Sequence, residues 1–198
     1  MPKSFRKVAL KYPVLIRNVN NLSDARYCAG MGVKIIGFNF SPDHAASIEE
    51  AVYQGIRGWI TGVEIAVKTA NLLDYKSLEP DYVLTEEEYS VNHGEIDLPV
   101  IYAFDINNVP EILPPKGSYL LVYTSNIEDK LKLHDNFIGH ICKDFKVFLG
   151  FGFDENNIHE VHATFEPYGF ALEGGHEIAP GLKTFEDLAN ILEVIEID

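Results

Sequence analysis

Eight short apolar segments constrain the fold of this chain more than any other feature of its sequence. They are rich in β-branched and aromatic residues. Most are continuous rather than alternating, which is typical of strands buried on both faces of a parallel sheet. The segments cover residues 13–19, 33–40, 59–67, 81–85, 98–104, 118–124, 146–153 and 168–173.

Amphipathic segments with helical spacing lie between many of these strands. The predicted helices cover residues 21–33, 47–59, 125–137, 154–165 and 183–195. Ser47, with Glu50 three residues later, has the pattern of a capping box, and Asp154 and Thr184 are predicted caps of the last two helices. The connection over 104–118 is short and holds three prolines, so its helix is predicted to be stunted.

The strands alternate with helices at a repeat of about 25 residues. This order predicts a single, lean (β/α)8 barrel over residues 1–198. The alternative is a doubly wound sheet, which usually has fewer strands and a glycine fingerprint after the first one. No such fingerprint follows residues 13–19. In a (β/α)8 barrel the functional groups are expected at the carboxyl ends of the strands.

Charge and composition exclude several classes of partner. The formal net charge of −14 argues against broad contacts with DNA, RNA or an anionic membrane. A small anionic ligand remains compatible with an acidic chain, because backbone dipoles bind anions locally. Cys28 and Cys142 are far apart and outside any CxxC motif, and no apolar run approaches the ~20 residues of a membrane span. We predict a cytoplasmic soluble protein without a cofactor, and leave its oligomeric state open.

Glycines gather after the last two predicted strands. Gly150 and Gly152 lie at the end of the seventh, and Gly174 and Gly175 follow the eighth. In many barrels the loops at these two places hold a phosphate, because glycines let the backbone approach and helix-start amides point at the anion. Gly152, Gly174 and Gly175 are therefore the predicted phosphate-binding residues. The alternative is that these glycines only make tight turns.

Three stretches of the chain resemble phosphoribosylanthranilate isomerase, a (β/α)8 enzyme of tryptophan biosynthesis. Residues 15–42 are similar to the family's opening, residues 148–158 to its glycine-rich motif on strand seven, and residues 171–183 to its closing motif. The closing motif is the most specific, with family residues at Gly175, Glu177, Pro180, Gly181 and Lys183. The resemblance implies an Amadori rearrangement, in which a ribose ring opens and a proton leaves its C2 atom.

The same resemblance implies that both proton-transfer groups are replaced. The family's general base, a cysteine on strand one, falls on Arg17. Its general acid, an aspartate on strand six, falls on Val122, or on Tyr123 if the register slips by one. Arginine stays protonated near neutral pH, and valine has no proton to transfer. The weak substitutes, all carboxylates near predicted strand ends, are Asp105, Glu64 and Glu173.

Other family features are missing as well. The arginine expected to meet the anthranilate carboxylate is absent after strand two, and Phe151 replaces one glycine of the strand-seven motif. Phe151 is expected either to block a backbone amide or to point into the barrel. Three functions stay open: an isomerase with substituted catalytic groups, a barrel that binds a phosphorylated metabolite with changed or no catalysis, and a non-enzymatic scaffold whose strand-end mouth is filled.

Three further residue groups carry a functional and a plain interpretation. His159 and His162 are three apart on a predicted helix and could share a metal, but a solvated helix face is favoured and no metal is predicted. His176 is interpreted as a loop histidine, with a phosphate contact as the alternative. Cys28 lies on the apolar stripe of the first helix and is interpreted as a small core residue.

Overall fold

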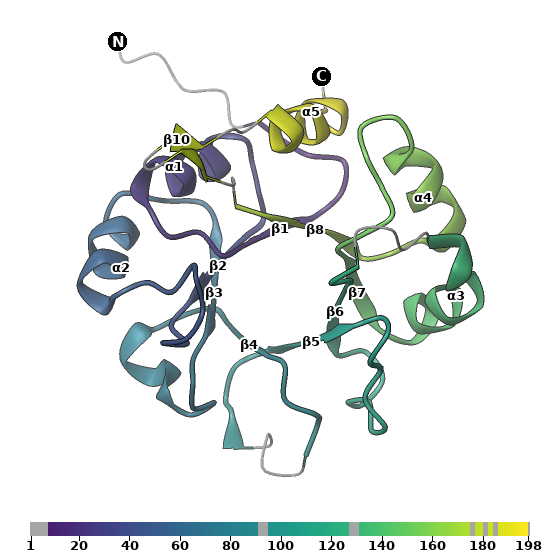
Figure 1. Ribbon diagram of the computed structural model, residues 1–198, viewed down its shortest axis with the longest axis horizontal. Coiled ribbons are helices and arrows are strands. Elements are labelled where there is room, and N and C mark those ends of the chain that lie inside the picture. Colours follow the sequence, from purple (N-terminus) through teal and green to yellow (C-terminus); the bar gives the residue numbers. More distant parts are fainter. Residues whose placement is uncertain are drawn as a thin grey trace.

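Eight parallel strands form a closed barrel, as Figure 1 shows. The computed structural model describes residues 8–90, 95–126, 131–174, 177–179, 182–183 and 186–197. Each strand pairs with its neighbours in the chain, and β8 pairs with β1 to close the barrel. The predicted (β/α)8 barrel is confirmed. The strands are β1 (Val14–Arg17), β2 (Ile35–Asn39), β3 (Glu64–Lys68), β4 (Tyr82–Thr85), β5 (Val100–Asp105), β6 (Tyr119–Tyr123), β7 (Lys146–Leu149) and β8 (Gly169–Glu173).

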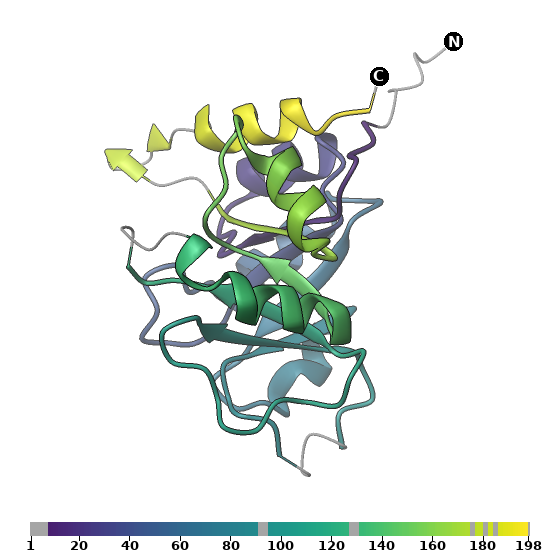
Figure 2. The ribbon, with the colours of Figure 1, turned by 90° about the vertical axis from the view of Figure 1, so that its right-hand side faces the viewer.

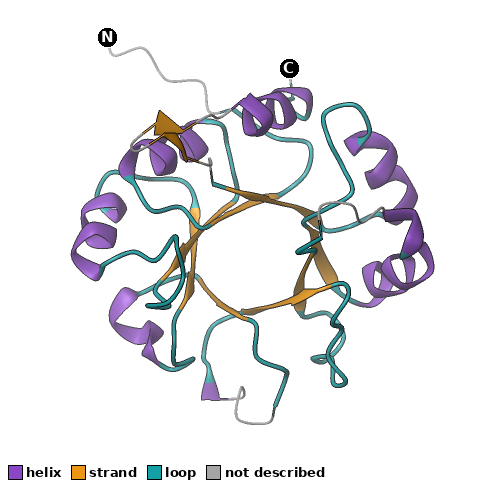
Figure 3. Ribbon diagram, in the orientation of Figure 1, coloured by secondary structure: helices purple, strands orange, loops and turns teal. Residues whose placement is uncertain are grey.

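Helices form an outer ring around the strands (Figure 3). The described part of the chain forms α1 (Leu22–Gly30), α2 (Glu50–Arg57), α3 (Asp135–Asp144), α4 (Ile158–Phe165), α5 (Glu186–Val194) and the 3₁₀ helices η1 (Asp74–Leu78) and η3 (Leu131–Leu133). A two-stranded antiparallel sheet, β9 (Glu177–Ala179) with β10 (Leu182–Lys183), precedes α5. Figure 2 shows α3, α4 and α5 one above another along one side. None of the described helices has the length and apolar character needed to cross a membrane.

Three predicted helix starts were wrong. The helix predicted over 154–165, α4, begins at Ile158 with Asn157 rather than Asp154 as its N-cap. The predicted cap of the last helix, Thr184, lies outside the described residues. The second helix, α2, begins at Glu50 without a side-chain cap, and Ser47 instead forms a bridge with the end of β2. The third, α3, begins at Asp135 rather than at residue 125. Its buried face is made by Ile138 and Ile141, which lie beyond the predicted helix, so the packing against the barrel selects a later segment.

The apolar side chains divide into two layers. One layer fills the barrel interior; its buried members are Leu15, Ile35, Ala66, Tyr82, Leu84, Ile101, Ala103, Leu121, Phe148 and Ala171. The other lies between the strands and the helices, and includes Val122 and Phe151. Because successive side chains of a strand point to opposite faces, Leu121 and Tyr123 face the interior while Val122 faces the helices.

Aromatic and charged side chains form the floor of the barrel, at the amino-terminal ends of the strands. The rings of Tyr82 and Tyr168 each pack edge-on against Tyr119, with centroids 5.5 Å apart. The Tyr82 hydroxyl donates a hydrogen bond of 3.2 Å to Glu64, which also forms an ion pair of 3.1 Å with Lys34. This floor closes the end of the barrel opposite the expected site.

Loops rather than α-helices follow β4 and β5 in the described residues, although Phe137 of α3 packs edge-on against Phe104 of β5. The connection over 106–118 contains no helix, so the predicted stunted helix is reduced to a loop. The described residues of the connection over 86–99 contain no α-helix either. In Figure 3 the connection between β5 and β6 runs as a loop, and the described part of the connection between β4 and β5 is loop apart from a short helical piece. Two irregular loops therefore cover the outer face of this sector.

Candidate binding site at the strand ends

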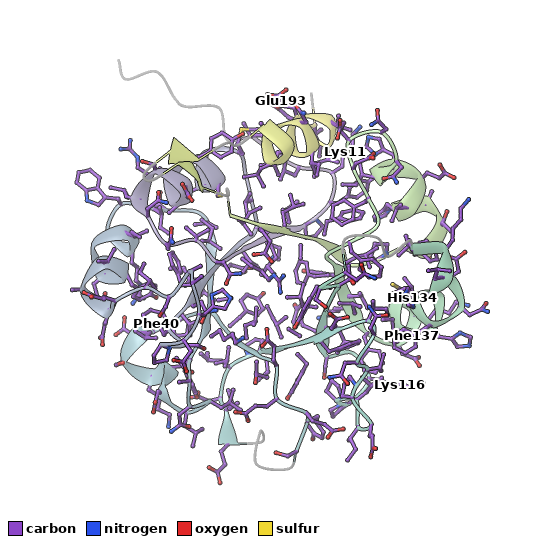
Figure 4. All side chains as sticks on the ribbon, viewed as in Figure 1. Lys11, Phe40, Lys116, His134, Phe137 and Glu193 are labelled. Atoms are coloured by element: carbon purple, nitrogen blue, oxygen red, sulfur yellow. The ribbon has the colours of Figure 1, made fainter. Side chains whose placement is uncertain are left out.

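A cavity of about 290 Å³ lies at the carboxyl ends of the strands. Figure 4 shows side chains from the surrounding strands filling the centre of the barrel. The charged and polar walls of the cavity are made by the last residues of five strands and by residues that directly follow a strand. The residues that matter most are Arg17, Asn39, Lys68, Glu86, Tyr123 and Glu173.

Arg17 and Glu173 form an ion pair on one wall of the cavity. They are the last residues of β1 and β8 and lie opposite each other in the register of these strands. The Asn18 side chain donates a hydrogen bond of 2.7 Å to the other Glu173 oxygen. The Arg17 guanidinium also lies 4.7 Å from the centre of the Tyr123 ring, within the range of a cation–π contact. These three contacts fix the positions of the Arg17 guanidinium and the Glu173 carboxylate.

A second ion pair and a pair of asparagines complete the walls. Lys68, at the end of β3, contacts Glu86 just beyond β4 at 2.6 Å. Asn39 is almost fully buried; its amide oxygen accepts from the Ser41 backbone at 2.9 Å, and its amide nitrogen donates to Asn18 at 3.4 Å. The cavity therefore presents two cations and two carboxylates, with amide groups between them.

The register places Tyr123, and not Val122, in the cavity. Val122 is fully buried in the layer beneath the helices, whereas Tyr123, the alternative position of the family acid, lines the cavity. Burial, followed by the charge of Glu86, raises the pKa of the Tyr123 hydroxyl. Tyr123 therefore keeps its proton near neutral pH and acts as a hydrogen-bond donor rather than as a general base.

The substitute carboxylates lie in three different settings. Glu173 is in the cavity, paired with Arg17. Asp105 ends β5 but accepts backbone hydrogen bonds from Asn107 and Ser125, at 2.9 and 2.8 Å. Burial acts to raise the pKa of the Asp105 carboxyl, but these hydrogen bonds outweigh it and hold that pKa below its usual value. Asp105 is therefore ionised and engaged near neutral pH.

Glu64 lies at the wrong end of the barrel for the predicted site. It is the first residue of β3, beside Lys34 and the floor. The prediction failed because β3 begins at residue 64 and not at residue 59: Trp59 is exposed, and Gly62 turns the chain with a positive φ of 76°. A late start of a short strand moved Glu64 from the predicted mouth to the opposite end.

Local contacts account for two of the three glycines predicted to bind phosphate. The Gly174 amide donates a hydrogen bond of 2.8 Å to the Arg17 carbonyl, continuing the β1–β8 ladder. A Cβ atom at Gly174 would lie 3.2 Å from the same carbonyl, so the close backbone explains this glycine. Gly152 has a φ of 78°, and a Cβ there would lie 2.7 Å from Leu131 Cβ. The third predicted residue, Gly175, and the neighbouring His176 lie outside the described residues.

The turn before α4 is held by its own side chains, and Asn157, the N-cap of α4, makes no side-chain capping hydrogen bond. The Asp154 carboxylate accepts from the Asn156 and Asn157 amides at 2.8 and 3.2 Å, and the Asn157 side chain accepts from the Asp154 amide at 2.8 Å. Phe151 is buried in the outer layer, edge-on to His134, and enters neither the barrel nor the cavity. The amides of Gly150, Asp154, Asn156 and Asn157 therefore bond to protein groups.

The remaining sequence candidates pack as ordinary side chains. The Tyr12 hydroxyl lies 2.9 Å from His159 Nδ1, and the Tyr12 ring stacks on His162 at 4.0 Å. The described residues hold no cluster of three or more side chains suited to a metal ion. Cys28 is fully buried in the core, as predicted, and burial raises the pKa of its thiol to about 12.

Sequence reasoning did not select Asn18, Asn39, Lys68 or Glu86 as site residues. Asn39 and Lys68 carry a usable signal, since each is the polar residue that ends an apolar strand. Glu86 and Asn18 follow strands directly and could be found by the same rule. Their pairing depends on which strands are neighbours in the closed barrel.

No protein-family model and no curated protein matches the sequence. Solved structures match the fold. Phosphoribosyl anthranilate isomerase from Thermotoga maritima is 19% identical with a TM-score of 0.73, covering 93% of this chain and 98% of its own. The enzyme from Thermus thermophilus is 22% identical with a TM-score of 0.72, covering 92% and 97%. A phosphoribosyl anthranilate isomerase in complex with reduced 1-(o-carboxyphenylamino)-1-deoxyribulose 5-phosphate is 17% identical with a TM-score of 0.69, covering 93% and 98%. These similarities establish a fold like that of the isomerases.

Proposed function

We propose that this protein is a divergent relative of phosphoribosylanthranilate isomerase that binds a small phosphorylated metabolite in its strand-end cavity without efficient catalysis of the isomerisation. The observation that carries the proposal is the position of Arg17. It stands where the resemblance puts the general base, and it is paired with Glu173 and stacked on Tyr123. A binding group has taken the place of a proton acceptor.

The isomerisation needs a base that removes a proton from carbon and an acid that returns one. Arg17 stays protonated, and Tyr123 has a pKa raised further from neutrality. Asp105 is held ionised by two backbone amides. Loss of a general acid or base typically costs about 10²- to 10⁴-fold in rate, so loss of both leaves little of the reaction.

The ligand class follows from the walls of the cavity. A volume of about 290 Å³ is at the small end of ligand sites, which suits a metabolite of a few carbon atoms. Arg17 and Lys68 offer charge-assisted hydrogen bonds to an anion, and the asparagines offer amide groups to hydroxyls. Because the Gly174 amide is used within the barrel, we place the phosphate on these side chains rather than on that amide.

The scaffold alternative predicts a mouth filled by side chains. The side chains expected to fill it are Phe151, Tyr123 and Arg17. Phe151 packs in the outer layer instead, while Arg17 and Tyr123 lie at the mouth and line a cavity of about 290 Å³. These two observations favour a binding function over a scaffold without a ligand site.

Two measurements test the proposal. Expression in a tryptophan auxotroph that lacks the isomerase tests catalysis, and no rescue of growth is expected. Calorimetric titration with ribose 5-phosphate tests binding, with Arg17→Met as the variant and Lys132→Met, an exposed lysine of η3, as the control. Arg17→Met should abolish the binding and Lys132→Met should preserve it. Rescue of growth, or binding that Arg17→Met does not change, would overturn the proposal.

A further inference from the structure

The charged side chains that line the strand-end cavity cancel one another. Its cations are Arg17 and Lys68, and its carboxylates are Glu86 and Glu173. His44 also lines the cavity and is counted as neutral, because its Nδ1 accepts a backbone amide hydrogen bond of 3.1 Å. Each cation already contacts one of the carboxylates. The described walls therefore form a neutral site made of two ion pairs, within a chain of net charge −14.

A phosphate that binds here must compete with the carboxylates of the cavity. Near neutral pH a phosphate monoester carries a charge of about −1.5 to −2 and draws hydrogen bonds from Arg17 and Lys68. A ligand with no other charge weakens the partners of a carboxylate and makes a neutral cavity negative, in an already acidic chain. A cationic group on the same ligand removes this cost, because it replaces the cation that the carboxylate has lost.

The pair of Lys68 and Glu86 is the one that can open. Lys68 Nζ lies 2.6 Å from the Glu86 carboxylate, and the two side chains are 20% and 43% exposed. A lysine has a flexible stem, so its ammonium can turn toward a phosphate. The pair of Arg17 and Glu173 is braced, because Asn18 bonds to the second Glu173 oxygen and the guanidinium lies over an aromatic ring. Glu86 is therefore the carboxylate that a ligand can take over.

Glu86 also lies near the expected phosphate position. The Arg17 guanidinium lies over the Tyr123 ring, 4.7 Å from its centre. Glu86 approaches the same side chain from its other end: burial first, and then the charge of Glu86, raise the pKa of the Tyr123 hydroxyl. One tyrosine side chain thus separates the guanidinium from the carboxylate. A ligand with a short chain between an anionic and a cationic group matches this arrangement.

We propose that the cavity selects a phosphorylated primary amine, with its phosphate on Arg17 and Lys68 and its ammonium beside Glu86. The ligand ammonium replaces Lys68 at the carboxylate, so that each charge of the site keeps a partner of opposite sign. The proposal rests on the proposed function, because the phosphate uses the same two cations. A sugar phosphate without an amine is the weaker ligand.

Calorimetric titration with a matched pair of ligands tests this selection. Phosphoethanolamine carries an ammonium where ethylene glycol monophosphate carries a hydroxyl, and the two molecules are otherwise alike. The amine should bind about tenfold more tightly at neutral pH, because it adds a charge-assisted hydrogen bond to Glu86. The preference should decrease as salt is added, since Glu86 is partly exposed.

Variants of the two partners of one ion pair should change the preference in opposite directions. Glu86→Gln should bring the two affinities to within about twofold, because the amide carries no charge. Lys68→Met should weaken both ligands but widen the preference, because Glu86 then lacks its internal cation. Glu79→Gln is the control: Glu79 is also ion-paired, 3.0 Å from Arg57, but it precedes β4 at the other end of the barrel. Thermal unfolding shows which variants are folded, and either partner alone tests the proposal.

The outcomes separate this proposal from the proposed function. Equal affinities for the two ligands, or a preference that survives Glu86→Gln, would overturn the amine and leave phosphate binding in place. Binding of ribose 5-phosphate without binding of phosphoethanolamine would do the same. Phosphoethanolamine binding that Arg17→Met does not change would place that ligand outside the cavity and overturn the proposal. Failure of all three phosphates to bind would overturn the proposed function itself.

Discussion

Arg17 and Glu173 form an ion pair where β8 meets β1. The final side chain of the first strand thus contacts the final side chain of the last strand at the mouth of the barrel. The pair has two consequences. It neutralises a cation at the position where the resemblance implies a general base. It also places a carboxylate where an incoming anion must compete for the same guanidinium.

Removal of the Glu173 charge should strengthen the binding of anions. In Glu173→Gln the amide still accepts from Asn18, but it competes less for Arg17. A gain of about 1 kcal/mol corresponds to roughly fivefold tighter binding of ribose 5-phosphate, measured by calorimetric titration. Glu160→Gln, on exposed α4, should leave the affinity unchanged. Weaker binding by Glu173→Gln would mean that the carboxylate itself contacts the ligand.

Aspartate should be tolerated at residue 123 and not at residue 122. Val122 is fully buried in the outer layer, where an unpaired carboxylate costs about 4 kcal/mol or more in the free energy of unfolding. Tyr123→Asp loses the stacking on Arg17 but gains a counter-charge, so a cost of about 1 to 2 kcal/mol is expected. Urea unfolding followed by circular dichroism compares the two. Similar stabilities would contradict the register.

Alanine should have opposite effects at Gly152 and Gly139. At Gly152 the positive φ and the contact with Leu131 both oppose a Cβ, so Gly152→Ala should lower the free energy of unfolding by about 1 to 3 kcal/mol. Gly139 lies within α3 with open space around it, so Gly139→Ala should raise that free energy by about 0.5 to 1 kcal/mol. Chemical unfolding of both variants measures the difference. A stable Gly152→Ala would show that Leu131 moves away readily.

The stabilising effect of Asp105 should depend on pH. Its folded-state pKa is lowered, so its ionised form stabilises the fold above the usual aspartate pKa of about 4. That stability is lost as the pH falls through the lower, folded-state value. Asp105→Asn should therefore destabilise the protein at pH 7, by less than about 1 kcal/mol because the carboxyl is partly exposed, and much less at acid pH. Urea titrations at the two pH values test this, and a difference that grows in acid would contradict it.

The sequence was sufficient for the fold because the apolar segments recur in number and order. Continuous apolar runs such as 146–153 identify buried parallel strands without any knowledge of their partners. The ends of the strands were harder to predict from the sequence. The run over 59–67 began too early because Trp59 is apolar but exposed, and exposure depends on what the fold brings alongside.

The site was only partly predictable for a related reason. Arg17 and Glu173 were both found at strand ends, but their ion pair exists only because the first and last strands become neighbours. Gly174 was interpreted through a possible ligand, whereas its space is taken by the backbone of β1. Contacts across the closing seam join residues more than 150 positions apart, which a local pattern cannot reveal.

The tyrosine floor lies at the end of the barrel opposite the strand-end cavity. Tyr82 and Tyr168 pack edge-on against Tyr119 across the amino-terminal end of the barrel, and apolar side chains fill the space above them. A packed interior therefore separates the strand-end cavity from the amino-terminal ends of the strands. The two ends of the barrel can thus be altered independently, since a change in the floor leaves the groups that line the cavity untouched.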